Sequence, residues 1–189
     1  MATWSGACGA SADDAKQSGT AMSLTASMSV SSATHYLGVR FQNVTVSQGA
    51  TINSATLTVD VPSTSSDSPN GVTWYGELAT NAAAFTTTAS DITNRAQTTA
   101  TLVWSGSNIG TGDHNLTVTS IAQEIVNQGG WASGNAMALL LYGVAANIQI
   151  TSYDTSTTLC ARLAIDYTAG GGGGGITMHA MYYARMREG

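Results

Sequence analysis

Apolar and polar residues alternate along most of the first 168 positions of the chain. Between Val39 and Val59 the sequence reads VRFQNVTVSQGATINSATLTV, with one alternating run on each side of Ser47-Gln48-Gly49. Successive side chains of a β-strand point to opposite faces of a sheet, so each run predicts a strand with one face on the core. The polar break predicts a turn that joins the two runs as antiparallel strands.

The same alternation recurs along the chain and predicts a mainly β domain. The run AMALLLYG at 136–143 is instead apolar at successive positions, which indicates a central strand covered on both faces. About eight to ten short strands separated by turns are typical of an antiparallel β-sandwich, here interpreted as a jelly roll. The predicted strands are 22–30, 37–42, 52–61, 72–78, 101–104, 114–118, 136–143, 148–150 and 159–167.

One short helix is predicted near 120–128. Ser120 followed by Gln123 fits a capping box, in which a hydroxyl and a side-chain amide satisfy the first backbone N–H groups of a helix. Ile121, Ile125 and Val126 form an apolar stripe, and Gly129 can end the helix. Residues 80–94 are predicted to form a long ordered connection.

The composition divides the chain into a β-sandwich domain at 1–168, a glycine linker at 169–175 and a C-terminal segment at 176–189. The even positions from Ile176 to Met186 are apolar, and so short a segment cannot bury them on itself. We interpret it as a docking segment that adds a strand to a neighbour or lies in a groove; folding back onto its own domain is the alternative. A strand and a helix both fit its pattern. The residues expected to dock are Ile176, Met178, Met181, Tyr182, Tyr183, Arg185, Met186 and Arg187.

Charged residues are scarce, at 9% of the chain with a net charge of −5, against about 25% in an average soluble protein. A general nucleic-acid binder needs several phosphate contacts from Lys and Arg, and Lys16 is the single lysine, so we expect no nucleic-acid partner. No apolar run approaches the roughly 18 residues of a membrane helix, so no membrane partner is expected. The first residues, MATWSGACGASADD, lack the basic and apolar regions of a signal peptide.

No pattern of residues predicts catalysis. The histidines His35, His114 and His179 have no partners at metal-ligand spacing, and there is no G-x-S-x-G sequence, so we expect neither an enzyme nor a cofactor. Asp13-Asp14 could contribute to a structural calcium site, although capping and turn hydrogen bonds are the simpler interpretation. Cys8 and Cys160 are expected either to form a disulfide or to be two small buried residues.

Three residues are candidates for binding a ligand on the surface. Arg40 alternates out of phase with Val39 and Phe41 and could contact a sugar or an anion, but pairing with a carboxylate of a neighbouring strand is the more common use. An ion pair is expected for Arg162 as well, because it shares a strand face with Asp166. Tyr75 and Trp104 could provide a stacking surface, whereas Trp74 and Trp131 are predicted to lie in the core.

Three stretches of this chain resemble the jelly-roll domains of the DNRLRE-type, carbohydrate-binding-module-like superfamily, which also occur in phage and metagenomic structural proteins. They are VRFQNVTVSQGATINSATLTV, IAQEIVNQGGWASGNAMALLLYG and ARLAIDYT. The resemblance covers residues 11–168. Ser47 and Cys160-Ala161 stand where such domains often have proline, and the signature of the sugar-binding members is missing, so the resemblance implies the fold rather than sugar binding.

These observations lead to one expected function and to alternatives. We expect a non-enzymatic virion structural protein, such as a bacteriophage capsid decoration (cement) protein or a head or tail fibre component on the particle surface. Its partners would be other virion proteins or further copies of itself, by analogy in a trimer. The alternative is a carbohydrate-binding module or phage adhesin, virion-borne or extracellular, that recognises a polysaccharide. An enzyme on a β scaffold, such as a lyase or depolymerase, is the third possibility.

Overall fold

A computed structural model of the chain describes residues 1–25, 27–63, 67–144 and 146–170. The elements are β1 (Ala2–Ala7), the 3₁₀ turn η1 (Ser11–Asp13), β2 (Asp14–Ser18), β3 (Ala21–Ser23), β4 (Met28–Val30), β5 (His35–Val44), β6 (Thr51–Val61), β7 (Asp67–Ser68), β8 (Val72–Glu77), β9 (Gln97–Trp104), β10 (Gly112–Thr117), α1 (Thr119–Val126), β11 (Asn135–Tyr142), β12 (Asn147–Ile150) and β13 (Arg162–Thr168). Most of the predicted linker and all of the C-terminal segment lie outside the described residues.

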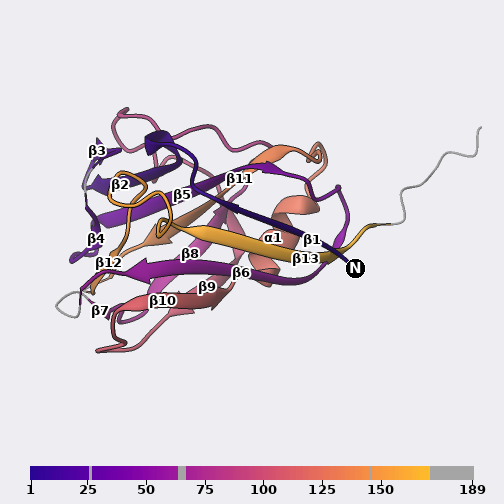
Figure 1. Cartoon of the computed structure of the whole chain (residues 1–189). Coiled ribbons are helices and arrows are strands. Elements are labelled where there is room, and N and C mark those ends of the chain that lie inside the picture. The colour runs from indigo at the N-terminus through magenta and orange to yellow at the C-terminus, as the bar shows by residue number, and fades with distance from the viewer. Residues whose placement is uncertain (26, 64–66, 145, 171–189) are drawn as a thin grey trace, which may run out of the picture.

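The predicted mainly β, antiparallel sandwich is confirmed. A four-stranded sheet, in the order β1-β13-β6-β10, packs against a six-stranded sheet in the order β3-β2-β5-β11-β8-β9 (Figure 1). A small three-stranded sheet, β4-β12-β7, closes one end. The inward-facing side chains of the two large sheets form the main core, which includes Leu57, Leu163 and Ile165 from one sheet and Phe41, Trp74 and Leu139 from the other.

The turn at Ser47-Gln48-Gly49 exists, but the two strands that it connects are not paired with each other. Gly49 adopts a positive φ of 67°, which suits glycine in a turn. β5 pairs with β2 and β11 in the six-stranded sheet, whereas β6 pairs with β10 and β13 in the four-stranded sheet. The segment therefore carries the chain from one layer of the sandwich to the other, because alternation within a strand says nothing about its partner.

The N-terminal part of the chain also differs from the prediction. The alternating run 22–30 is divided into β3 and β4, which belong to different sheets. β1 and β2 were not predicted at all. β1 pairs with the last strand, with Ala2 opposite Tyr167, so the two ends of the described chain lie side by side (Figure 1).

α1 lies where a helix was predicted, but its N-terminus is not a capping box. Val118 is the N-cap residue and makes no side-chain capping bond. Thr119 and Gln123 instead accept the backbone N–H groups of Ala55 and Ile52, at 2.9 and 2.8 Å. The polar side chains at the start of α1 therefore attach the helix to β6, which needs partners for those N–H groups at this end of the sandwich.

β11 is covered on both faces, as predicted. One face belongs to the main core, and the other lies under residues 78–96, here called loop 78–96. Phe85 and Ile92 from this loop are buried against Ala138 and Leu140. Gly38 on the neighbouring β5 is required there, because a Cβ atom at this position would overlap the Phe85 ring.

Candidate functional site

Two of the three candidate binding residues, Arg40 and Tyr75, lie on the outer face of the six-stranded sheet. Arg40 is opposite Ala138 of β11, and Tyr75 is opposite Leu140. Loop 78–96 covers Arg40 and also Leu140, the residue opposite Tyr75. The hydroxyl of Tyr142 donates to the carbonyl of Ile92 in this loop at 3.5 Å, so the loop reaches the neighbours of Tyr75 as well.

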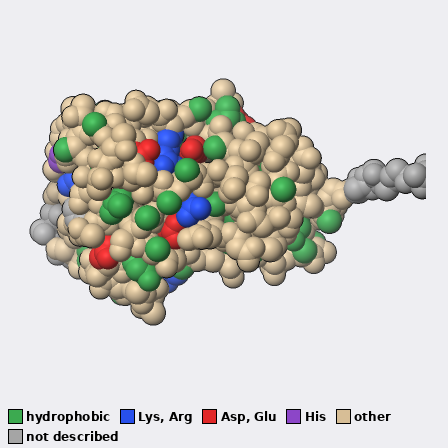
Figure 2. Space-filling view, turned by 90° about the horizontal axis from the view of Figure 1, so that it is seen from above, with side chains coloured by type: hydrophobic (Ala, Val, Ile, Leu, Met, Phe, Trp, Pro, Cys, Tyr) green, Lys and Arg blue, Asp and Glu red, His purple; other side chains and the backbone are tan. Residues whose placement is uncertain are grey.

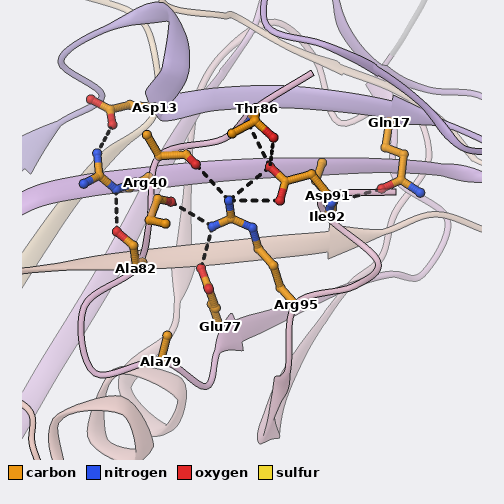
Figure 3. A network of polar contacts seen from close by, with 12 residues as sticks. Asp13, Gln17, Arg40, Glu77, Ala79, Ala82, Thr86, Asp91, Ile92 and Arg95 are labelled. Atoms are coloured by element: carbon orange, nitrogen blue, oxygen red, sulfur yellow. Dashed lines mark hydrogen bonds and ion pairs between the residues drawn. The ribbon is translucent and has the colours of Figure 1, made fainter. Parts of the chain in front are cut away.

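Arg40 is part of the fold, as the ion-pair interpretation predicted. Its Nη1 lies 2.5 Å from Oδ1 of Asp13, and its Nε donates to the carbonyl of Ala82 at 2.8 Å (Figure 3). The other oxygen of Asp13 accepts from the side chain of Gln42 and from the N–H of Gly9. With the Arg40 side chain only 14% exposed, its hydrogen-bonding groups attach loop 78–96 and the N-terminal turn to β5.

The prediction that Trp104 lies on the surface is wrong. Its side chain is only 6% exposed and belongs to the main core. Trp104 pairs with Val72, an inward-facing residue of β8, so the register places the indole on the inner face. Val103 occupies the outward position and is 57% exposed.

Tyr75 is one member of a row of three half-buried tyrosines on the outer face of the six-stranded sheet. Tyr142 of β11 lies between Tyr36 of β5 and Tyr75 of β8, with ring centroids 4.9 and 5.3 Å apart and edge-to-face geometry. Burial raises the pKa of Tyr142, so its hydroxyl is a neutral donor and acceptor at physiological pH. We call Tyr36, Tyr142 and Tyr75 the tyrosine row. Sequence reasoning missed Tyr36 and Tyr142 because only strand register brings them together.

Loop 78–96 is held down by Arg95, a residue that sequence reasoning also missed. Its guanidinium forms ion pairs with Glu77 at 2.7 Å and Asp91 at 3.1 Å (Figure 3). It also lies 4.2 Å above the centre of the Phe85 ring. It also donates to the carbonyls of Ala83 and Ala84. The side-chain oxygen of Gln17 on β2 also holds this loop, because it accepts the N–H groups of Ile92 and Thr93.

Asp13 and Asp14 point to different partners and do not form a shared cation site. Asp13 is occupied by Arg40 and Gln42, while Oδ2 of Asp14 accepts the N–H of Tyr153 at 2.6 Å. No group of three or more potential metal-ligating side chains is found among the described residues. Burial, with a smaller contribution from Asp154, raises the pKa of Asp14 from 3.8 to about 7.

Cys8 directly follows the last residue of β1, and Cys160 lies just before the first residue of β13. The two cysteines are therefore neighbours at this end of the strand pair. Both are buried free thiols, and the Cys160 thiol donates to the carbonyl of Cys8 at 3.6 Å. Burial raises the pKa of both thiols, so each is neutral at physiological pH. The remaining ionisable candidates, His35 and His114, contact Ser31 and the carbonyl of Gly110 respectively, and His179 lies outside the described residues.

The outer face of the four-stranded sheet is lined by small polar residues and has two shallow hollows along β13. One hollow, of about 240 Å³, is lined by Ser5, Gly6, Thr58, Arg162, Leu163 and Ala164. The other, of about 160 Å³, is lined by Thr3, Trp4, Ser5, Ser54, Thr56, Ala164, Ile165 and Asp166. Because the short side chains of Ser5 and Ala164 line both, we call the two hollows together the furrow.

Charged groups stand at both ends of the furrow. Arg162 pairs with Asp113 of β10 rather than with Asp166, which corrects the expected pairing. Within the described residues, Nε of Arg162 and Oδ1 of Asp166 are buried and have no hydrogen-bond partner. Both atoms are covered by neighbouring atoms, so the charged residues border the furrow without exposing these two groups in it.

In a space-filling view, blue and red side chains lie beside one another, and most of the remaining surface is neither charged nor apolar (Figure 2). No described helix is long and apolar enough to cross a membrane. Comparison with protein-family models finds no match to this chain, and comparison with curated proteins finds no similar sequence. The functional interpretation therefore depends on the geometry of the domain itself.

Proposed function

We propose that this chain is a non-enzymatic virion structural protein, such as a bacteriophage capsid decoration (cement) protein or a head or tail fibre component. In this proposal the sandwich is a rigid body, and segment 176–189 docks on a neighbouring subunit. The observation that best supports it is that ionisable side chains form ion pairs and hydrogen bonds between elements of the fold. We call these contacts braces. A catalytic acid, base or nucleophile has to face a substrate, whereas these groups face the fold.

The braces join different elements of the fold. Arg40 joins β5 to Asp13 of the N-terminal turn, and Arg95 joins loop 78–96 to Glu77 of β8. The carboxylate of Glu124 on α1 accepts the N–H groups of Thr99 and Ala100 on β9. Such contacts stabilise one arrangement of the layers, which suits a protein that works by presenting a fixed shape.

The position of the chain ends supports attachment at one end of the sandwich. β1 begins beside the last residues of β13, so the linker at 169–175 starts at the end of the domain where β1 begins (Figure 1). A body that is attached there leaves its opposite end and the outer face of the four-stranded sheet available. A specific protein interface buries about 800 Å² on each partner, an area that a docking segment and part of a sheet face together can provide.

Removing residues 169–189 is expected to abolish self-association without unfolding the domain. Size exclusion with light scattering should find a defined oligomer for the full-length chain and a monomer for the chain that ends at Thr168. The shortened chain should keep its melting temperature to within about 2 °C, since every described element ends by Thr168. An oligomer of unchanged size after truncation would contradict this proposal, whereas a monomeric full-length chain would mean either that the segment docks on a different virion protein or that the domain is a binding module.

The tyrosine row favours a second candidate function, a carbohydrate-binding module or adhesin. Tyr36, Tyr142 and Tyr75 bring three half-buried aromatic rings together on the outer face of the six-stranded sheet. Sugar rings bind to such surfaces through apolar stacking and hydrogen bonds. This candidate does not need segment 176–189, so truncation separates it from the first.

If the tyrosine row binds a polysaccharide, Tyr75→Ala should weaken that binding roughly ten-fold, which corresponds to about 1.4 kcal/mol. A glycan array of the full-length protein would identify the ligand, and titration calorimetry would measure the affinity. Tyr153→Ala is a matched control, because Tyr153 is half-buried elsewhere and contacts Asp14 through its backbone. Equal loss of affinity in both variants would exclude the tyrosine row as the site.

A further inference from the structure

We propose that the furrow on the four-stranded sheet is the docking site for segment 176–189 of a second copy of this chain. The inference rests on the proposed function, in which this segment leaves its own domain and binds a neighbour. It adds the location of the receiving surface, on β1, β13 and β6, and the way in which the segment lies there.

The spacing of the two hollows matches the spacing of side chains along an extended segment. The hollows lie on either side of Ser5 and Ala164, one toward Arg162 and the other toward Asp166. Their centres are thus separated by one pleat repeat of β13, about 6.7 Å. Side chains at positions i and i+2 of an extended chain have the same separation, and the segment has apolar residues at every even position from Ile176 to Met186.

The residues that line the furrow suit a bound peptide, whose apolar side chains can enter the hollows while its backbone forms hydrogen bonds with the walls. Ala164 forms the floor between the hollows, and Ser5, Thr56 and Thr58 bring hydroxyl groups to its walls. These hydroxyls can donate to carbonyls or accept from N–H groups. A peptide segment supplies partners of both kinds, together with side chains that enter the hollows.

Charge also favours this occupant. Residues 1–168 contain four of the six basic residues and ten of the eleven acidic ones, whereas segment 176–189 contains Arg185, Arg187 and the single acid Glu188. A cationic segment is attracted to an anionic domain, and the attraction weakens with added salt. Two anionic domains repel each other, so the basic segment supplies the attraction that association between copies requires.

The test is a photo-cross-linking experiment on full-length protein. A benzophenone amino acid is placed at position 178, and copies labelled with ¹⁵N are mixed with unlabelled copies before irradiation. Mass spectrometry then distinguishes cross-links between copies, which join heavy and light peptides, from those within one copy. We expect mixed cross-links to peptides from β1, β13 and β6.

Ala164→Trp fills the furrow with a side chain that is compatible with a strand, and should reduce the yield of mixed cross-links at least ten-fold. Ala132→Trp is the matched control, because Ala132 is an exposed alanine that does not line the furrow. Ser5→Trp provides a second variant in case Ala164→Trp impairs folding. Far-UV circular dichroism and the melting temperature of each variant establish that it is folded.

Cross-links confined to single copies would overturn the proposal, because the furrow would then hold its own segment. Cross-links to the tyrosine row, to another face or to no part of the domain would also overturn it, as would unchanged yields in folded Ala164→Trp and Ser5→Trp. Failure here is distinguishable from failure of the proposed function. If truncation abolishes the oligomer while the cross-links map elsewhere, only the furrow is excluded; if truncation leaves the oligomer intact, the docking role of the segment itself is excluded.

Discussion

Replacing Arg95 with methionine is expected to lower the free energy of unfolding by about 3–5 kcal/mol, because it leaves buried carboxylates without their partner. The Arg95 side chain is 7% exposed and that of Glu77 is 11% exposed, so water cannot take the place of the guanidinium. The variant also loses the donors that hold the carbonyls of Ala83 and Ala84, and the contact with the Phe85 ring. The melting temperature should fall by roughly 10 °C, since 1 kcal/mol corresponds to about 2–4 °C in a domain of this size.

The matched control for Arg95→Met is Arg162→Gln. The ion pair between Arg162 and Asp113 has side chains 31% and 47% exposed, and such pairs contribute about 0–1 kcal/mol. Hydrogen exchange provides a second measurement, because amides of loop 78–96 should exchange faster in Arg95→Met while those of β6 and β13 keep their protection. Equal stability losses in the two variants would contradict the assignment of Arg95 as the main brace of this loop.

Replacing Asp14 with asparagine is expected to stabilise the protein at pH 8 and to have little effect at pH 4. Burial raises the pKa of Asp14 from 3.8 to about 7, so the folded state favours the neutral carboxyl. Between these values the unfolded chain binds fewer protons than the folded one, and stability therefore falls as the pH rises. The interval is roughly three pH units at about 1.4 kcal/mol each, so the cost at pH 8 is on the order of 4 kcal/mol.

Asparagine removes this cost and keeps an oxygen that can accept the N–H of Tyr153, so we expect a gain of about 2–4 kcal/mol at pH 8. Urea unfolding at several pH values between 4 and 8 would measure it. The neighbouring Asp13→Asn is the control with the opposite sign, since Asp13 pairs with Arg40 and its loss should destabilise the protein. An Asp14→Asn variant whose stability decreases with pH as steeply as that of the wild type would refute the role of Asp14.

Local sequence patterns predicted where the strands lie better than they predicted which strands pair with each other. Alternation identified β5, β6 and β13 because one face of each strand lies on the core, and a continuous apolar run identified β11, which is covered on both faces. Alternation could not show that β5 and β6 belong to different sheets, since hydrogen bonds between strands depend on residues far away in the sequence. The same limit explains Trp104, whose alternation fits either face until its pairing with Val72 is known.

The candidate site was less predictable than the fold for a related reason. Arg40 was correctly expected to pair with a carboxylate, but its partner, Asp13, comes from a turn 27 residues earlier. The tyrosine row combines residues from three strands, and the furrow depends on Ala164 being short beside Ser5. At Ser120 the sequence contained a local capping motif that the structure does not use. Thr119 and Gln123 instead accept backbone N–H groups of β6.

The pairing of β1 with β13 has a consequence for how this domain can be re-engineered. Ala2 and Tyr167 are opposite each other on adjacent strands, which are about 4.8 Å apart, so a few residues could join the ends covalently. New termini could then be opened in the turn between β9 and β10 with every strand pairing retained. Such a circular permutant would move the point of attachment to the other side of the domain, and the sandwich would become a scaffold whose orientation on a surface can be chosen.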